Sequence, residues 1–222
     1  MSGPIRYALL AFALLAGVVS AAAQQQEDEI FRPNDGRRRR SRLSMEWNVQ
    51  AGATLSEYSA HGTTAEIAPK AGYHFSMAIG MLFHPNFAVV PELRFSHAAF
   101  DMTGRAGGSS SVKGNTLDFP IRFEGRILRG RLRFYAGPAF TLMDKYRFSY
   151  GGSTEEGMRI RPTVTYVAGI AGVPVRRMTV DVRFNGQFNR TEQIYGWRAA
   201  DPDYAEYRLG IYGFSVSIGY LF

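Results

Sequence analysis

Ser96 and His97 are the residues of this chain whose types come nearest to those of a catalytic centre. A membrane barrel that deacylates lipids would need a histidine together with a serine and a carboxylate near the outer leaflet. Neighbouring residues of a β-strand point to opposite faces, so Ser96 and His97 do not form a dyad by themselves. We therefore expect His97 to be an interfacial side chain, and we predict that the protein is not an enzyme.

No other set of residues indicates a metal or phosphate site. The spacing of histidines and carboxylates fits no metal site, and no calcium-loop motif occurs. The glycine-rich residues 107–111 lack the Gly-Lys-Ser/Thr ending of a phosphate-binding loop. The chain has no cysteine, so neither disulfides nor thiol chemistry are available. We predict no cofactor, and we expect His74 to join a polar network inside a barrel.

A set of charged residues recurs on the polar side of alternating segments. These residues are Glu46, Glu92, Arg94, Asp118, Arg122, Glu124, Arg133, Arg161, Asp181 and Arg183. Confined in a narrow interior they should pair, because an unpaired buried charge is costly and arginine can bind a carboxylate through two hydrogen bonds. Such an ion-pair network would plug the interior, so we do not expect conduction through it.

The elements that must position these side chains are β-strands. From Met45 onward, apolar and polar residues alternate with a period of two in eight segments. The segments are 45–55, 71–83, 87–96, 117–126, 132–142, 160–170, 178–188 and 212–222. Long polar connections at 56–69, 101–115, 144–159 and 190–206 alternate with short turns. The pattern predicts an all-β fold: an eight-stranded antiparallel up-and-down transmembrane β-barrel, spanning residues 45–222, with long extracellular loops and short periplasmic turns.

The bulk of the apolar side chains decides which face points outward. A soluble, lipocalin-like barrel would hide its apolar face inside, but an eight-stranded interior is only just wide enough to be filled by side chains. The apolar face carries too many Phe, Tyr, Met and Leu residues to fit there. It also carries no charge along the strand centres, as expected if each charge facing lipid costs ~2–4 kcal/mol at the midplane. The aromatic face should therefore contact lipid.

Four prolines argue mildly against a closed barrel. Pro91, Pro120, Pro138 and Pro162 fall inside the alternating segments, and a closed barrel has no edge to hide a missing N–H. Each of them needs a bulge or a strand end.

The last segment has one aromatic and aliphatic face, formed by Phe214, Val216, Ile218, Tyr220 and Phe222. It resembles the terminal strand of bacterial outer-membrane barrels, whose alternating aromatic ending is read by the barrel-insertion machinery. We expect these residues to be the insertion signal.

The beginning of the chain predicts export. Arg6, an apolar run and small residues at Ala21 and Ala23 indicate a cleaved signal peptide over residues 1–23 rather than a membrane anchor. The formal charge of +7 is concentrated in the arginines of residues 37–42. We expect residues 24–44 to be a disordered basic periplasmic tail, or one that contacts anionic headgroups or an acidic partner. A nucleic-acid partner is not expected for a chain that leaves the cytoplasm.

Two neighbouring segments carry a family resemblance. Residues 117–123 (LDFPIRF) and 134–140 (FYAGPAF) resemble consecutive strands of the PorT-like outer-membrane β-barrel family common in Bacteroidetes. The resemblance extends over residues 47–222 and implies a barrel fold and an outer-membrane location. It supplies no active-site residues.

The function class that fits these observations is a small closed barrel with a structural or interaction role. Its expected partners are outer-membrane lipid and lipopolysaccharide, the insertion machinery, and a periplasmic or surface protein. Tyr195, Trp197 and Tyr204 are the candidate loop contacts. An outer-leaflet lipid-modifying enzyme and, less favoured, a narrow porin are the alternatives.

Overall fold

A computed structural model describes residues 44–61, 66–103, 109–159, 163–188, 191–192 and 208–222. The strands are β1 (Ser44–His61), β2 (Glu66–His84), β3 (Phe87–Thr103), β4 (Ser109–Ile127), β5 (Leu132–Tyr150), β6 (Ser153–Arg159), β7 (Thr163–Gly172), β8 (Met178–Gln187), β9 (Thr191–Glu192) and β10 (Arg208–Leu221). A short 3-10 turn, η1 (Leu128–Gly130), connects β4 to β5. The predicted signal peptide, the predicted basic tail up to residue 43 and the predicted loop contacts at Tyr195, Trp197 and Tyr204 lie outside these ranges, whereas Ser44, predicted as the end of the tail, begins β1.

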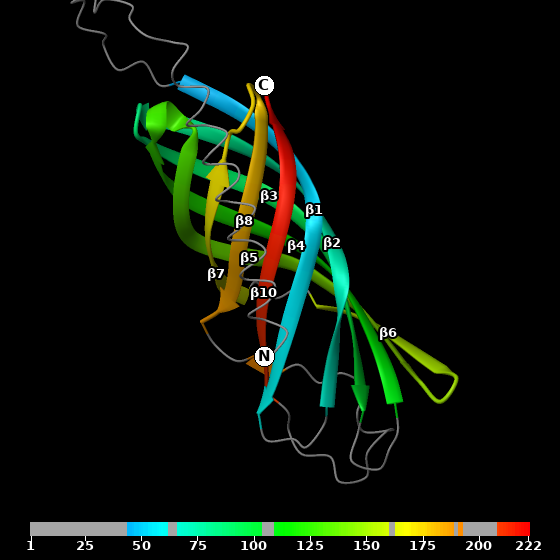
Figure 1. Cartoon of the computed structure of the whole chain (residues 1–222). Coiled ribbons are helices and arrows are strands. Elements are labelled where there is room, and N and C mark those ends of the chain that lie inside the picture. The colour runs from blue at the N-terminus through cyan, green and yellow to red at the C-terminus, as the bar shows by residue number, and fades with distance from the viewer. Residues whose placement is uncertain (1–43, 62–65, 104–108, 160–162, 189–190, 193–207) are drawn as a thin grey trace, which may run out of the picture.

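Eight of the strands form a closed antiparallel ring, which confirms the predicted fold class (Figure 1). The order around the ring is β1-β2-β3-β4-β5-β7-β8-β10, and β10 pairs with β1 from Asn48↔Leu221 to His61↔Arg208. The two remaining strands add to this ring: β6 pairs with the far end of β5, and β9 pairs with β10. In the part of the chain that is described, no helix is long and apolar enough to cross a membrane.

The two ends of the barrel differ in their connections. The β2–β3, β4–β5 and β7–β8 turns are short and lie at the same end as the C-terminus, at the top of Figure 1. Leu128, Arg129 and Gly130 adopt positive φ angles there, as a tight turn requires. Short turns mark the periplasmic end of an outer-membrane barrel, so the opposite end is extracellular.

The aromatic face points outward, as the size argument requires. Phe75, Phe123, Phe214 and Ile218 come from three different strands and are 44–60% exposed. The residues that alternate with them are buried inside the ring, and many of them are polar or charged. The same alternation that predicts each strand therefore also separates the lipid-facing surface from the lumen.

The strands extend far beyond the predicted segments at the extracellular end. The predicted loops at 56–69, 101–115 and 144–159 are wrong for most of their length, because β1 to β6 continue through these residues. The outer face of this extension carries charged residues such as Asp101, Lys113 and Arg147 beside small ones such as Ala99, so the period-two pattern fades although the backbone pairing continues. Gly151 and Gly152, both with positive φ, form the tight turn of the β5–β6 hairpin.

The prolines lie beside interruptions of the ladder. The β4–β5 pairing omits residues 121–122 and 137–138, and the β2–β3 pairing omits residues 90–91. Pro138 and Pro91 fall within these gaps. The N–H that each proline lacks therefore does not interrupt the pairing of β5 with β4 or of β3 with β2. Pro162 lies outside the described ranges.

Candidate functional site

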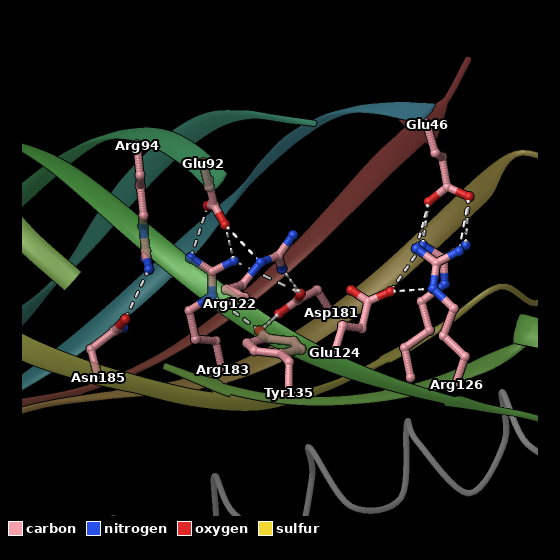
Figure 2. Close-up of polar contacts among 11 residues, drawn as sticks. Glu46, Glu92, Arg94, Arg122, Glu124, Arg126, Tyr135, Asp181, Arg183 and Asn185 are labelled. Carbon is pink, nitrogen blue, oxygen red and sulfur yellow. Dashed lines mark hydrogen bonds and ion pairs between the residues drawn. The ribbon is translucent and has the colours of Figure 1, made fainter. Parts of the chain in front are cut away.

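A cluster of four charged side chains and one tyrosine fills the middle of the lumen (Figure 2). The central cluster consists of Glu92 on β3, Arg122 on β4, Tyr135 on β5, and Asp181 and Arg183 on β8. Their exposed fractions are 0–5%, so the whole cluster is shielded from solvent. It contains as many guanidinium groups as carboxylates and is therefore neutral.

The Glu92–Arg183 pair crosses the full width of the barrel. Arg183 donates from Nη1 to Oε1 and from Nη2 to Oε2 of Glu92, both at 2.9 Å. In the ring, β3 and β8 are separated by three strands on either side, so the two residues start from opposite walls. This two-bond geometry is the strong form of an arginine–carboxylate contact. The pair therefore acts as a crossbar through the lumen.

Tyr135 and Asp181 hold the two arginines in place. The Tyr135 hydroxyl donates to Asp181 Oδ1 at 2.6 Å and accepts from Arg183 Nε at 3.0 Å. Arg122 lies 3.2 Å from Glu92 and 3.4 Å from Asp181, with its guanidinium 4.7 Å from the centre of the Tyr135 ring. Each carboxylate thus contacts both guanidinium groups or their tyrosine bridge, which is what two buried ion pairs need to offset desolvation.

A second cluster closes the lumen nearer the periplasmic turns. The periplasmic cluster consists of Glu46 on β1, Glu124 and Arg126 on β4, and Arg133 on β5. Arg133 Nη1 lies 2.6 Å from Glu46 Oε1, and Arg126 Nε lies 2.7 Å from Glu124 Oε1. Arg126 also reaches Glu46 at 3.2 Å. This cluster is neutral as well, and the Glu46–Arg133 contact again joins opposite strands of the ring.

Arg94 and Asp118 stand apart from both clusters. Arg94 donates to Asn185 Oδ1 at 3.1 Å and to Thr54 Oγ1 at 3.4 Å, while Asp118 accepts from Thr141 at 2.7 Å. Among the residues with described positions, neither of them has an ion-pair partner within 4.0 Å. Of the ten predicted network residues, seven are thus brought into ion pairs and these two are not. Arg161 lies outside the described ranges.

Two lumen residues were missed by sequence reasoning. Arg126 shares the inward parity of Arg122 and Glu124 on β4, and this signal was present in the sequence. Tyr135 also has the inward parity, but an aromatic residue at such a position does not by itself indicate a polar network. Its role depends on Asp181 and Arg183, which lie on a strand that is not adjacent to β5.

His74 and His97 have ordinary hydrogen-bond partners. The buried His74 lies in the lumen, with its Nδ1 2.9 Å from Thr54 Oγ1. The His97 ring stacks on Tyr73 at 5.0 Å and lies 2.6 Å from Asn115 Oδ1. Over the described ranges, no three His, Cys, Asp or Glu residues are grouped as a metal site.

Ser96 does not share the surroundings of His97. Its hydroxyl lies 2.9 Å from the hydroxyl of Thr116, and the two residues are adjacent across the β3–β4 pairing. The structure therefore separates the serine from the histidine of the candidate dyad.

The candidate insertion-signal residues all belong to the outer face or end of β10. Phe214 is 44% exposed and packs 5.1 Å from Phe184, and Phe222 is 70% exposed and packs 4.9 Å from Tyr220. Ile218 is also exposed, and Val216 is half-buried. Recognition of this strand by the insertion machinery stays a prediction.

Known structures share the architecture of this barrel. Ail, the attachment invasion locus protein of Yersinia pestis, has a TM-score of 0.51 and 16% identity, covering 80% of this chain and 98% of Ail. The same protein in complex with the heparin analogue sucrose octasulfate has a TM-score of 0.50 and 14% identity, covering 80% and 99%. Neisserial surface protein A has a TM-score of 0.46 and 11% identity, covering 78% and 96%. At these identities the likeness shows the fold alone.

Comparison of the sequence itself gives the family. No curated protein matches it. A family model described as "Outer membrane protein beta-barrel domain" matches residues 22–189, which is most of the chain. The barrel, its lipid-facing aromatic surface and this match together place the protein in the bacterial outer membrane. The chain belongs to the outer membrane protein β-barrel domain family.

Proposed function

We propose that this protein is a closed barrel that makes contacts at the cell surface and does not conduct solutes. The observation that carries the proposal is the pair of neutral clusters that cross the lumen from opposite walls. Their side chains occupy the middle and the periplasmic part of the narrow interior that an eight-stranded barrel leaves. With passage through the lumen blocked, the outer surface of the barrel at its extracellular end is the place for contacts with large partners.

The extracellular extension of β2 to β6 supplies such a surface. In the strand registers, Lys70 lies beside Ala99, Ala99 beside Lys113, and Lys113 beside Arg147. Lateral neighbours share a face of a sheet, and Lys145 shares it too because it lies two residues from Arg147. These four cations, all exposed, form what we call the cationic row.

Carboxylates offset only part of this charge. Lys70 contacts Asp101 at 2.7 Å, and Glu156 pairs with Arg147 and, at 3.6 Å, with Lys145. Hydrogen bonds from Lys70 and Arg147 lower the pKa values of Asp101 and Glu156 respectively, so both carboxylates stay ionised at neutral pH. Within the described ranges, Lys113 has no carboxylate within 4.0 Å. The row therefore keeps an excess of positive charge.

The phosphorylated saccharide of lipopolysaccharide is the partner that we propose for this row. In the strand registers the row lies on the extracellular side of the stacked Tyr73 and His97, which we take as part of the interfacial aromatic girdle. Clustered lysines and arginines at that level attract anionic headgroups. Ail was crystallised with a sulfated saccharide, sucrose octasulfate, which shows that a barrel of this fold can hold a polyanion.

Binding of lipopolysaccharide tests the proposal. In Lys113→Gln with Arg147→Gln, affinity is expected to fall about tenfold at physiological salt, because two cations near an anionic surface are lost. The measurement is titration of the purified barrel in nanodiscs with fluorescent lipopolysaccharide. Arg129→Gln with Arg176→Gln removes the same charge at the periplasmic end and should change nothing. Equal affinity for the row variant and the wild type would contradict the assignment.

We also propose that the barrel is not a lipid-modifying enzyme. The support is the separation of Ser96, bonded to Thr116, from His97, which stacks on Tyr73. Cells carrying Ser96→Ala with His97→Ala are expected to show the same lipid A and phospholipid mass spectra as wild-type cells. A lipid species that changes only in the variant would contradict this proposal and support a lipid-modifying activity.

A PorT-like position within the family is the finer proposal. It rests on residues 117–123 and 134–140, which occupy the adjacent strands β4 and β5 and meet at Pro120↔Ala139. Grouping of the chain apart from PorT-like barrels in an alignment of family members would contradict it.

A further inference from the structure

A cavity of about 140 Å³ lies in the extracellular half of the lumen, beyond the central cluster. Arg94 on β3 and Asp118 on β4 both line it, together with hydroxyl and amide side chains from the surrounding strands. The volume is several times what a single water molecule requires. The site therefore has room for a small organic molecule and has both signs of charge in its wall.

Arg94 is a guanidinium group that its surroundings only partly satisfy. It is 3% exposed, and its two described hydrogen bonds go to the neutral side chains of Asn185 and Thr54. Its Nε has no hydrogen-bond partner. Every other described lumen arginine contacts a carboxylate within 4.0 Å. A buried cation without a counter-ion is costly, so Arg94 is the group in the lumen best suited to gain from an added carboxylate.

Asp118 is the matching carboxylate in the cavity wall, directly beside Arg94 in the β3–β4 register. Oδ1 accepts from Thr141 at 2.7 Å and Oδ2 from Thr116 at 3.4 Å. A carboxylate has about four lone-pair sites, so these two bonds leave acceptor capacity. Arg94 and Asp118 thus form a third balanced set of charges in the lumen. Over the described residues no ion pair within 4.0 Å joins them, although their backbones are adjacent and both side chains line the cavity.

We propose that this cavity binds a small zwitterion, an α-amino acid with a short aliphatic side chain. Its carboxylate accepts from Arg94, its ammonium group donates to Asp118, and its side chain packs against the apolar wall of Pro120, Ala139 and Val167. A simple anion would be repelled by Asp118, and a simple cation by Arg94. Only a ligand that carries both charges completes the pair.

The two charged clusters block the path from the cavity to the periplasm. The Glu92–Arg183 crossbar and the periplasmic cluster lie between the cavity and the periplasm. The ligand is therefore held in a pocket that ends inside the barrel, and binding involves no passage. This site is independent of the cationic row, which lies on the outer face of the sheet.

Nuclear magnetic resonance of the labelled wild-type barrel in nanodiscs tests the site directly. Titration with L-alanine is expected to shift the Arg94 Nε–H signal and the amide signals of Thr116 and Thr141 in a saturable way. Acetate and methylammonium, each carrying one of the two charges, are expected to bind at least tenfold more weakly. No shift with L-alanine, shifts confined to other residues, or equal binding of acetate would each overturn the proposal.

Two charge-removing variants separate the two halves of the site. Arg94→Gln and Asp118→Asn are each expected to weaken L-alanine binding at least tenfold, whereas the periplasmic control Arg176→Gln leaves it unchanged. If a lumen variant does not fold, the location of the shifts in the wild type still decides the outcome. Unaltered binding in both folded variants would contradict the assignment.

Discussion

Replacing Glu92 by glutamine is expected to lower the free energy of unfolding by about 3–5 kcal/mol. Glu92 is 1% exposed and is the carboxylate that both Arg183 and Arg122 contact. Without its charge, two buried guanidinium groups share the single carboxylate of Asp181, and the central cluster is left with a net positive charge. The measurement is urea unfolding of the barrel in lipid vesicles, followed by tryptophan fluorescence.

A compensating variant separates charge balance from the loss of hydrogen bonds. Glu92→Gln with Arg183→Gln makes the cluster neutral again through Arg122 and Asp181, so part of the lost stability is expected to return. Glu156→Gln, on the exposed β5–β6 hairpin, is the surface control and should not affect unfolding. If the double variant is as unstable as the sum of its single variants, the neutrality of the cluster is not what stabilises the lumen.

The wild-type barrel is expected to give no ion-conducting steps in planar bilayers. The central cluster and the periplasmic cluster each cross the lumen, so removing either one alone should leave the barrel sealed. Replacing all eight charged residues of the two clusters by serine keeps the lumen neutral while removing both obstructions. That variant is expected to show resolved steps, a change from no detectable conductance to a measurable one.

The control for this experiment is folding. A folded barrel resists unfolding in cold detergent and shifts its electrophoretic mobility only on heating, so each variant is compared before and after boiling. Steps in the wild type above those of a protein-free bilayer would contradict a closed lumen. A folded variant lacking both clusters that still fails to conduct would show that other side chains close the barrel.

The strand centres could be predicted because lipid and lumen impose opposite demands on successive residues. In β10, Phe214 and Ile218 face lipid while Ser215 and Ser217 are buried inside, so the sequence alternates strictly. Beyond the membrane this contrast disappears. Lys113 and Ser111 face water in place of lipid, so β4 reads as a loop there although its ladder continues.

The partners within the lumen could be predicted only as a set. Alternation assigns Glu92 and Arg94 to the same inward face, but it does not fix their distance from residues on the opposite wall. Strand register and stagger place Arg183 against Glu92 and leave Arg94 against Asn185. A shared face therefore predicts which side chains can come into contact in the lumen. Which of them do so depends on the geometry of the closed ring.

The crossbar has a consequence for the order in which this barrel forms. Glu92 and Arg183 are separated by 91 positions in the chain, whereas Glu92 and Arg122 lie on adjacent strands. Contacts between distant parts of a chain are delayed by the entropy of closing the intervening loop. The Glu92–Arg122 contact can form once β3 and β4 have paired. The Glu92–Arg183 crossbar can form only after β8 has joined the barrel. Water is thus expected to leave the centre of the lumen late in assembly, when the last strands have paired.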